Sequence, residues 1–390
     1  NTRQFVVVNS ATDTFKIRTM DSFVHVDSSA FPTYSSGGLV ERVYKVATTY
    51  TGAELAALKF VQSADVVTIV HPSHAPANLS RIADDSWTLA NITFTPGIGT
   101  VASLINSGAG SGTTFWAVTA VATETLEEGE SATTSTSAAE STLSGTPITV
   151  SWSALSGAQE YNVYRRRNGI YGFIGTAGST SFVDNGITPD FTITPPIHRA
   201  PFGSTDNYPS VVSYFQQRLT FAATNNDPEK IFCSKTGFFY NFDISSPIQD
   251  DDAITFNLSG RQVNAVRNLI EVGKPVVFTS SGEWILNGDD SQVLRPTSIN
   301  PKQQSYNGSA SLSPIIIGAS ALYVQARQSI IRDLGFDYQI DGYRGNDLTI
   351  FSNHLFDNYT LIDLTYQQVP NSIVWAVRSD GTLLGLTYVR

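Results

Sequence analysis

The chain has 390 residues and a mass of 42.2 kDa, with 24 Lys and Arg against 34 Asp and Glu and a formal net charge of −10. This balance excludes a general nucleic-acid binder and a polybasic membrane-surface protein, because both need an excess of basic residues. Cys233 is the single cysteine, which excludes an intrachain disulfide and a cysteine-based zinc site. The longest apolar runs, such as 315–317, are far shorter than the roughly 20 residues of a membrane helix, so we expect no membrane anchor.

Both ends of the sequence fall inside strand-like patterns, and residues 1–5 (NTRQF) lack the features of a signal peptide, so we interpret the chain as a fragment of a longer polypeptide. Residues 1–43 resemble the second half of an FCCH-type module, a small β-barrel first named in ubiquitin-activating enzymes. The likeness is carried by residues 5–7 (FVV) and 34–38 (YSSGG). It implies a partial β-barrel and no ubiquitin chemistry, which would need a nucleotide site and a catalytic cysteine.

The rest of the sequence reads as all-β, because β-branched and aromatic runs such as 66–70 (VVTIV) and 276–279 (VVFT) are bounded by turn residues. One segment differs. Residues 51–54 (TGAE) have the spacing of a capping box, and 55–58 (LAAL) have high helix propensity. The pattern predicts a helix over 51–58.

The composition changes at about residue 97, where a Gly- and Ser-rich stretch begins. Strand-like segments about ten residues apart follow, with an acidic, Ser- and Thr-rich loop at 124–145 between them. Trp152, Gly157 and residues 161–164 (YNVY) give this part a resemblance to fibronectin type III modules. We expect an inserted immunoglobulin/fibronectin-like sandwich over 97–198, with Trp152 in its core.

Outside the insert, five segments share the order turn, apolar strand, polar turn and second strand. They start near residues 65, 218, 275, 321 and 373, and removal of about 100 inserted residues brings the first gap to about 50. A period near 50 residues with several strands is typical of β-propeller blades. We expect a first blade in 44–96 and the remaining blades, truncated at the C-terminal end, in 199–390. The alternative is an irregular β-domain with strands of average spacing.

Two histidines, His71 and His74, lie three residues apart and suggest a zinc site. Pro72 excludes a helix across them and no third ligand lies nearby in sequence, so a solvated turn is the favoured interpretation. Gly-x-Ser-x-Gly, His-Glu-x-x-His and P-loop motifs do not occur. We expect no catalytic residues, no cofactor and no enzymatic activity.

A run of three acids, Asp250, Asp251 and Asp252, is a candidate calcium site because Ca²⁺ takes several oxygen ligands. Consecutive side chains on an extended chain point in opposite directions, which opposes three ligands on one ion. The favoured alternative is a solvated turn or an acidic edge that caps the strand beginning near Ile254.

The basic triplet Arg165, Arg166 and Arg167 is a candidate interaction site. It follows a strand and precedes Asn168-Gly169, a hairpin turn signal. An exposed hairpin end is the favoured interpretation, and a docking contact is the alternative.

Several ordered stretches resemble one family, the nozzle or packaged-DNA stabilisation proteins of short-tailed bacteriophages. They are spread over most of 43–390 outside the insert, and the most specific are 249–254 (QDDDAI) and 323–327 (YVQAR). The others are 43–50, 58–65, 69–72, 79–81, Trp87, 208–210, 215–219, 341–343, 347–348, 354–356, 366–370 and 378–385.

The resemblance implies a structural subunit of a bacteriophage tail that forms a homohexameric ring around the DNA exit channel and helps retain and deliver the genome. Its implied partners are further copies of the chain, the tail adaptor, tail fibres and genomic DNA that passes without tight binding. Its implied location is the virion tail, assembled in host cytoplasm. A net charge of −10 agrees with a conduit, because every neutralised phosphate would add affinity for DNA.

Two alternatives remain open at the level of the sequence. A carbohydrate-binding or carbohydrate-active tail protein at the host surface is compatible with an aromatic content of 11%. A sandwich-based bacterial surface adhesin is the other. With 34 acids, the sequence cannot nominate the carboxylate pair that glycoside hydrolysis needs.

Overall fold

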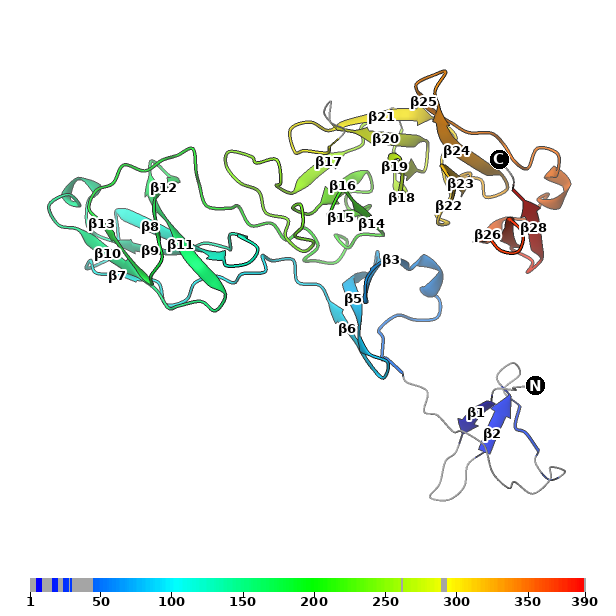
Figure 1. Cartoon of the computed structure of the whole chain (residues 1–390), viewed down its shortest axis with the longest axis horizontal. Coiled ribbons are helices and arrows are strands. Elements are labelled where there is room, and N and C mark those ends of the chain that lie inside the picture. Colours follow the sequence, from blue (N-terminus) through cyan, green and yellow to red (C-terminus); the bar gives the residue numbers. More distant parts are fainter. Residues whose placement is uncertain are drawn as a thin grey trace. The chain divides into compact units, whose positions relative to one another are not determined.

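The computed structural model describes residues 5–8, 16–19, 24–27, 29, 45–260, 262–288 and 293–388. The chain divides into two compact units, Asn1–Lys45 and Val46–Arg390. Regular structure in the described residues is β-strand apart from three single-turn 3₁₀ helices, which confirms the all-β fold class (Figure 1). These helices are η1 (Leu55–Ala57), η2 (Glu140–Thr142) and η3 (Asn353–Leu355).

The described part of the first unit forms an antiparallel hairpin of β1 (Phe5–Val8) and β2 (Lys16–Thr19). His25 makes an isolated bridge to Arg18, whose guanidinium donates to the His25 ring at 2.9 Å. The rest of the predicted small barrel, including 34–38, lies outside the described residues.

The second unit contains, within its described residues, five antiparallel meander sheets in which successive strands are neighbours. The first comprises β3 (Lys59–Ser63), β4 (Val66–His71), β5 (His74–Ala83) and β6 (Ser86–Asn91). The second comprises β14 (Val211–Phe215), β15 (Arg218–Ala222), β16 (Lys230–Cys233) and β17 (Ile254–Asn257). The third comprises β18 (Val266–Val272), β19 (Lys274–Thr279), β20 (Glu283–Asn287) and β21 (Asn300–Ser305). The fourth comprises β22 (Ile315–Ile317), β23 (Ser320–Val324), β24 (Ile331–Asp337) and β25 (Gly342–Arg344). The fifth comprises β26 (Leu361–Gln367), β27 (Ile373–Arg378) and β28 (Leu383–Thr387).

The five repeats predicted from the sequence each begin at the second strand of a sheet. Residues 65, 218, 275, 321 and 373 each fall within one residue of the start of the second strand of a sheet, namely β4, β15, β19, β23 and β27. Those strands stand inside their sheets with a neighbour on each side. The repeat found in the sequence is therefore the repeat of a propeller-like series of sheets.

Alternating side chains of one strand reach two different cores. In β19, Val277 belongs to the core shared with the second sheet, whereas Val276 and Phe278 belong to the core shared with the fourth. In β23, Tyr323 faces the third sheet and Leu322 the fifth. Successive side chains of a strand point to opposite faces, so a sheet covered on both faces needs an unbroken apolar run.

The same pairing continues through the series. One core joins the first and second sheets around Val70, Phe94, Phe202 and Phe221. The three phenylalanine rings meet edge to face at 4.9–5.7 Å. Further cores join the second sheet to the third, the third to the fourth and the fourth to the fifth. Each sheet is therefore stabilised by burial against the next one along the chain.

The first strands of the first three sheets lie close together. β14 contacts both β3 and β18. Lys59 of β3 reaches past β14 and donates to the Asn268 side chain of β18 at 2.8 Å and to the Arg267 carbonyl. This contact between the first and third sheets is expected where inner strands converge in a propeller-like arrangement.

The insert is a sandwich of two antiparallel sheets, with spatial orders β13-β10-β7 and β12-β11-β8-β9. Its strands lie between residues 105 and 184, inside the predicted range 97–198. They are β7 (Ile105–Asn106), β8 (Thr114–Ala122), β9 (Ala132–Thr136), β10 (Ile148–Ser151), β11 (Ala158–Arg167), β12 (Ile170–Ala177) and β13 (Ser181–Asp184).

The core of the sandwich contains Trp152, as predicted from the sequence. Trp152 is 6% exposed and its ring meets Tyr161 edge to face at 5.2 Å. Trp116, Val150 and Val163 belong to the same cluster. The two sheets of the sandwich therefore pack against each other around a separate hydrophobic core.

The helix predicted over 51–58 is wrong in extent, because only the single turn η1 forms. Glu54 accepts hydrogen bonds from the Thr51 N–H and hydroxyl at 2.8 Å, as in one half of a capping box. Leu58 is already extended, and Lys59 starts β3. No residue of η1 is buried, so no packed apolar face offsets the cost of helix nucleation.

Among the described residues, the structure contains no helix that is both long and apolar enough to span a membrane.

Candidate functional site

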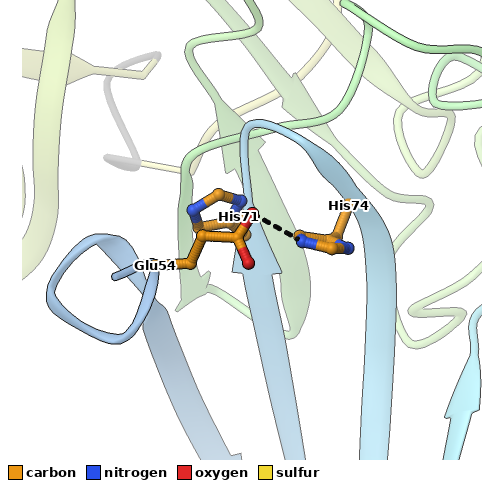
Figure 2. A group of neighbouring side chains, drawn as sticks. All are labelled: Glu54, His71 and His74. Atoms are coloured by element: carbon orange, nitrogen blue, oxygen red, sulfur yellow. Dashed lines mark hydrogen bonds and ion pairs between the residues drawn. The ribbon is translucent and has the colours of Figure 1, made fainter. Parts of the chain in front are cut away.

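Three side chains of the types that bind metals meet at one end of the first sheet. Glu54 comes from the turn before β3, His71 is the last residue of β4 and His74 is the first residue of β5. Figure 2 shows the three side chains pointing toward one another. Since β4 and β5 are paired and joined by a tight turn, His71 and His74 lie opposite each other in register, which the interposed Pro72 permits in a hairpin.

The ligand atoms are close enough to share a centre. One nitrogen or oxygen from each residue lies within 4.8 Å of the other two. The His74 Nε2 and Glu54 Oε1 atoms are 3.0 Å apart, and the two imidazole centroids are 5.1 Å apart. His71 is buried, whereas Glu54 and His74 are about one-quarter exposed at 27% and 24%. The cluster therefore reaches from the protein interior to its surface.

The surroundings fix the charge of two of these groups. Hydrogen bonds from Thr51, followed by that from His74, lower the pKa of Glu54 to about 2. Burial, and then the charge of His74, lower the pKa of His71. At neutral pH, Glu54 is therefore an anion and His71 is a neutral imidazole. The Ser73 N–H donates to His71 Nδ1 at 3.1 Å.

A pocket of about 500 Å³ lies beside the cluster, and His74 forms part of its wall. Tyr50, Asn91 and Tyr208 also line it. The Tyr50 ring meets His74 edge to face at 5.0 Å. Burial raises the pKa of Tyr50, so its hydroxyl stays protonated at neutral pH and can donate or accept a hydrogen bond in this pocket.

The sequence indicated His71 and His74 as candidate ligands, but nothing in it indicated Glu54 as the third. The expectation of a solvated turn is wrong for His71, which is the last residue of β4 and is 4% exposed. Glu54 lies 17 residues before His71, and its pattern with Thr51 indicated a capping role. In the structure, one carboxylate oxygen of Glu54 accepts from Thr51 and the other hydrogen-bonds with His74. The missing signal is tertiary, because nothing local places η1 beside the β4–β5 hairpin.

The acidic triplet is built into a turn before β17. Asp252 is fully buried and accepts the N–H groups of Ser245 and Gln249 at 2.8 Å. Asp250 pairs with Arg295 at 3.2 Å, and Asp251 pairs with Lys235 at 3.4 Å.

The backbone of the same turn is held by Arg218. Its guanidinium donates to the carbonyl oxygens of Asp250, Asp251 and Asp252 at 3.0, 3.3 and 2.6 Å. It also donates to Ser234 at 2.7 Å. The three carboxylates are thus divided among protein donors and cations, which favours the capping alternative over shared ligation of one ion.

The basic triplet separates into one buried and two exposed residues. Arg165 is 1% exposed, so an exposed hairpin end is wrong for this residue. Its guanidinium donates to Asp184 at 2.7 Å and to Glu140 at 2.8 Å. Arg166 and Arg167 are exposed, and Asn168-Gly169 form the expected turn with φ of 53° and 88°.

The burial of Arg165 has a visible signal in the sequence. Tyr161, Val163 and Arg165 alternate along β11, and the first two belong to the sandwich core. Trp116 also donates to Asp184 at 2.9 Å, which helps satisfy the carboxylate.

Comparison with known proteins adds little to these observations. The sequence matches no family model and no curated protein. One similar solved structure is the major allergen Mala s 1 of Malassezia sympodialis, at 9% identity. The likeness covers 84% of this chain and 90% of that chain, with a TM-score of 0.25. A likeness at this level supports no statement about fold or function.

Proposed function

We propose that the chain is a structural subunit of the tail of a short-tailed bacteriophage, a nozzle or tail-tube protein that forms a ring around the DNA exit channel. The observation that carries the proposal is where the family-like stretches lie. They occupy the hairpins and flanking turns of the first, second, fourth and fifth sheets and avoid the insert. The resemblance therefore follows the repeated sheet framework.

The framework suits a mechanical role. Its sheets are covered in sequence by shared cores, and the second, third and fourth sheets have a core on each face. Close-packed cores of this kind transmit strain and resist deformation. A subunit that retains packaged DNA and then lets it pass needs this stiffness more than it needs a reactive pocket.

The charge of the chain suits a conduit. With 34 acids and 24 bases, it lacks the excess of cations that would hold DNA through its phosphates. The proposed partners are further copies in a six-fold ring, the tail adaptor, tail fibres and DNA in transit, and the proposed location is the virion tail. The sandwich insert, with its separate core, is a candidate for contacts outside the ring.

Electron microscopy of the full-length gene product, alone and mixed with the tail adaptor, tests this function. Six-fold rings with an axial channel are expected in at least the mixture, because closure of a head-to-tail interface leaves no free edge. Labelling of virions with an antibody against this chain should mark the tail. Monomers in both preparations together with unlabelled tails would overturn the proposal.

A further inference from the structure

Three side chains of the types that ligate metals meet at the end of the first sheet. Two imidazoles and one carboxylate, from Glu54, His71 and His74, have ligand atoms within 4.8 Å of one another. Three protein ligands of this kind, with a fourth position left to water or another group, are a common zinc environment. Cysteine plays no part, so the site does not depend on the redox state of the compartment.

One of the three ligand-atom separations is already close to that of a zinc site. Zinc binds nitrogen and oxygen ligands at about 2.0–2.1 Å, so neighbouring ligand atoms of a tetrahedral site are about 3.4 Å apart. The 3.0 Å separation of His74 Nε2 and Glu54 Oε1 is close to that edge (Figure 2). Glu54 is also oriented from behind, since Thr51 donates twice to its other carboxylate oxygen. Such support of a ligand by neighbouring donors is typical of metal sites.

Two hydrogen bonds must be given up when a metal binds. The one between His74 Nε2 and Glu54 Oε1 is replaced by two metal–ligand bonds, because both atoms become ligands. The Ser73 N–H now donates to His71 Nδ1. If His71 binds a metal through either nitrogen, this hydrogen bond is lost, because Nδ1 becomes a ligand or carries the proton. Ser73 is exposed, so water can accept from its N–H. The net contribution of these two hydrogen bonds to stability is small beside the affinity of three ligands for zinc.

We propose that Glu54, His71 and His74 bind one Zn²⁺ ion that joins the segment 46–58 to the β4–β5 hairpin. The fourth coordination position is taken by water on the side of the pocket lined by Tyr50 and His74. The ion links residues that no strand pairing connects, because β3 begins only at Lys59. Its role is to fix the segment that leads into the first sheet, so it goes beyond the proposed tail function and does not depend on it.

Isothermal titration calorimetry of the untagged, chelator-treated chain with ZnCl₂ tests the proposal. We expect one Zn²⁺ per chain, a rise in melting temperature on zinc addition and no such rise with Mg²⁺ or Ca²⁺. Cobalt(II) should give the visible absorption of a tetrahedral site and should be displaced by zinc. Absence of saturable zinc binding would overturn the proposal.

Variants assign the site. Glu54→Gln and His74→Gln should each weaken zinc binding by more than the roughly 10–100-fold loss typical of outer-shell changes. Both residues are partly exposed, so these variants should fold without metal, which far-UV circular dichroism would show. His354→Ala removes an exposed histidine of η3 and serves as the matched control with unchanged binding. Equal weakening in His354→Ala, or full binding in both site variants, would assign the zinc to surface histidines and overturn the proposal.

Discussion

Arg165 is a charged residue held inside the inserted sandwich. Its guanidinium bonds Asp184, Glu140 and the Ile187 carbonyl, while Asp184 also accepts from Trp116 and from the Gly186 N–H at 3.0 Å. A buried ion pair of this kind costs desolvation free energy that its hydrogen bonds must offset. We therefore expect the pair to fix how β11 and β13 face one another, and to add little net stability.

Removal of one partner should be costly. We expect Arg165→Met to lower the unfolding free energy of the sandwich by about 3–5 kcal/mol, because the buried Asp184 would lose its cationic partner. Hydrogen exchange of peptides from 105–184 in the intact chain measures this loss. Arg167→Met is the matched control. Arg167 is 49% exposed, and its ion pair with Glu140 is long, at 3.5 Å. Equal effects of the two variants would contradict the assigned role.

Trp152 carries much of the apolar packing of the same sandwich. Trp152→Ala should lower the unfolding free energy of the insert by about 3–5 kcal/mol, through lost burial and the cavity left behind. The same hydrogen-exchange experiment reads the effect, and peptides from the five meander sheets should keep their protection because those sheets have separate cores. Unchanged exchange over 105–184 would show that the sandwich does not depend on this residue.

Among the elements, the turn before β17 is organised by Arg218. Four carbonyl oxygens accept from its guanidinium, a planar fork that an ammonium group cannot reproduce. Arg218→Lys should lower stability by about 1–3 kcal/mol, because some of those buried carbonyls lose their donor. Thermal unfolding measures the loss, and Asp251→Asn, which alters an exposed carboxylate, is the control.

The same turn gives a direct test of the calcium alternative. Asp250, Asp251 and Asp252 already have donors or cations of the protein. We therefore expect millimolar CaCl₂ or EDTA to leave the melting temperature unchanged, since a ligand stabilises only the state that binds it. A calcium-dependent rise that Asp250→Asn abolishes would establish the ion site instead.

Lys59 links β3 to β18 and should make this contact sensitive to pH. Burial, and then the charge of Arg267, lower the pKa of Lys59 to about 7. An unfolded lysine titrates near pH 10.4, so between these values the unfolded chain binds more protons and the unfolding free energy rises with pH.

Urea unfolding at pH 7 and pH 9.5 checks this sign. The stability of the wild type relative to Lys59→Met should increase from the lower to the higher pH, by a few kcal/mol at most, since one pKa unit is worth about 1.4 kcal/mol. Lys302→Met removes an exposed lysine of β21 and should show no such increase. Absence of this increase would mean that the two oxygen acceptors hold Lys59 charged over the whole range.

For the molecule as a whole, charge and repetition are the properties that bear on the proposed conduit. The 390-residue chain should leave duplex DNA unshifted at about 150 mM salt, because few cations are available to release counterions. Gel mobility with and without added salt is the measurement. Sub-micromolar binding that weakens steeply with salt would contradict a passage that lets DNA slide.

The sequence by itself determined the all-β class, the period of the sheets and the core position of Trp152. Each of these depends on local information: alternation along a strand, turn residues at its ends, and an apolar run where both faces of a sheet are covered. For the same reason, the repeat was found at the second strands, such as β19 and β23, which are buried on both sides.

Only the tertiary structure decided which distant side chains meet. Glu54 joins His71 and His74 because η1 lies against the β4–β5 hairpin, and Arg218 reaches the acidic turn across more than 30 residues of chain. The predicted helix at 51–58 shortened to the single turn η1, because none of the residues of η1 is buried to offset the cost of helix nucleation. Local propensity is worth a fraction of a kcal/mol per residue, whereas pairing and burial act over whole elements, so the contacts of the fold decide wherever the two disagree.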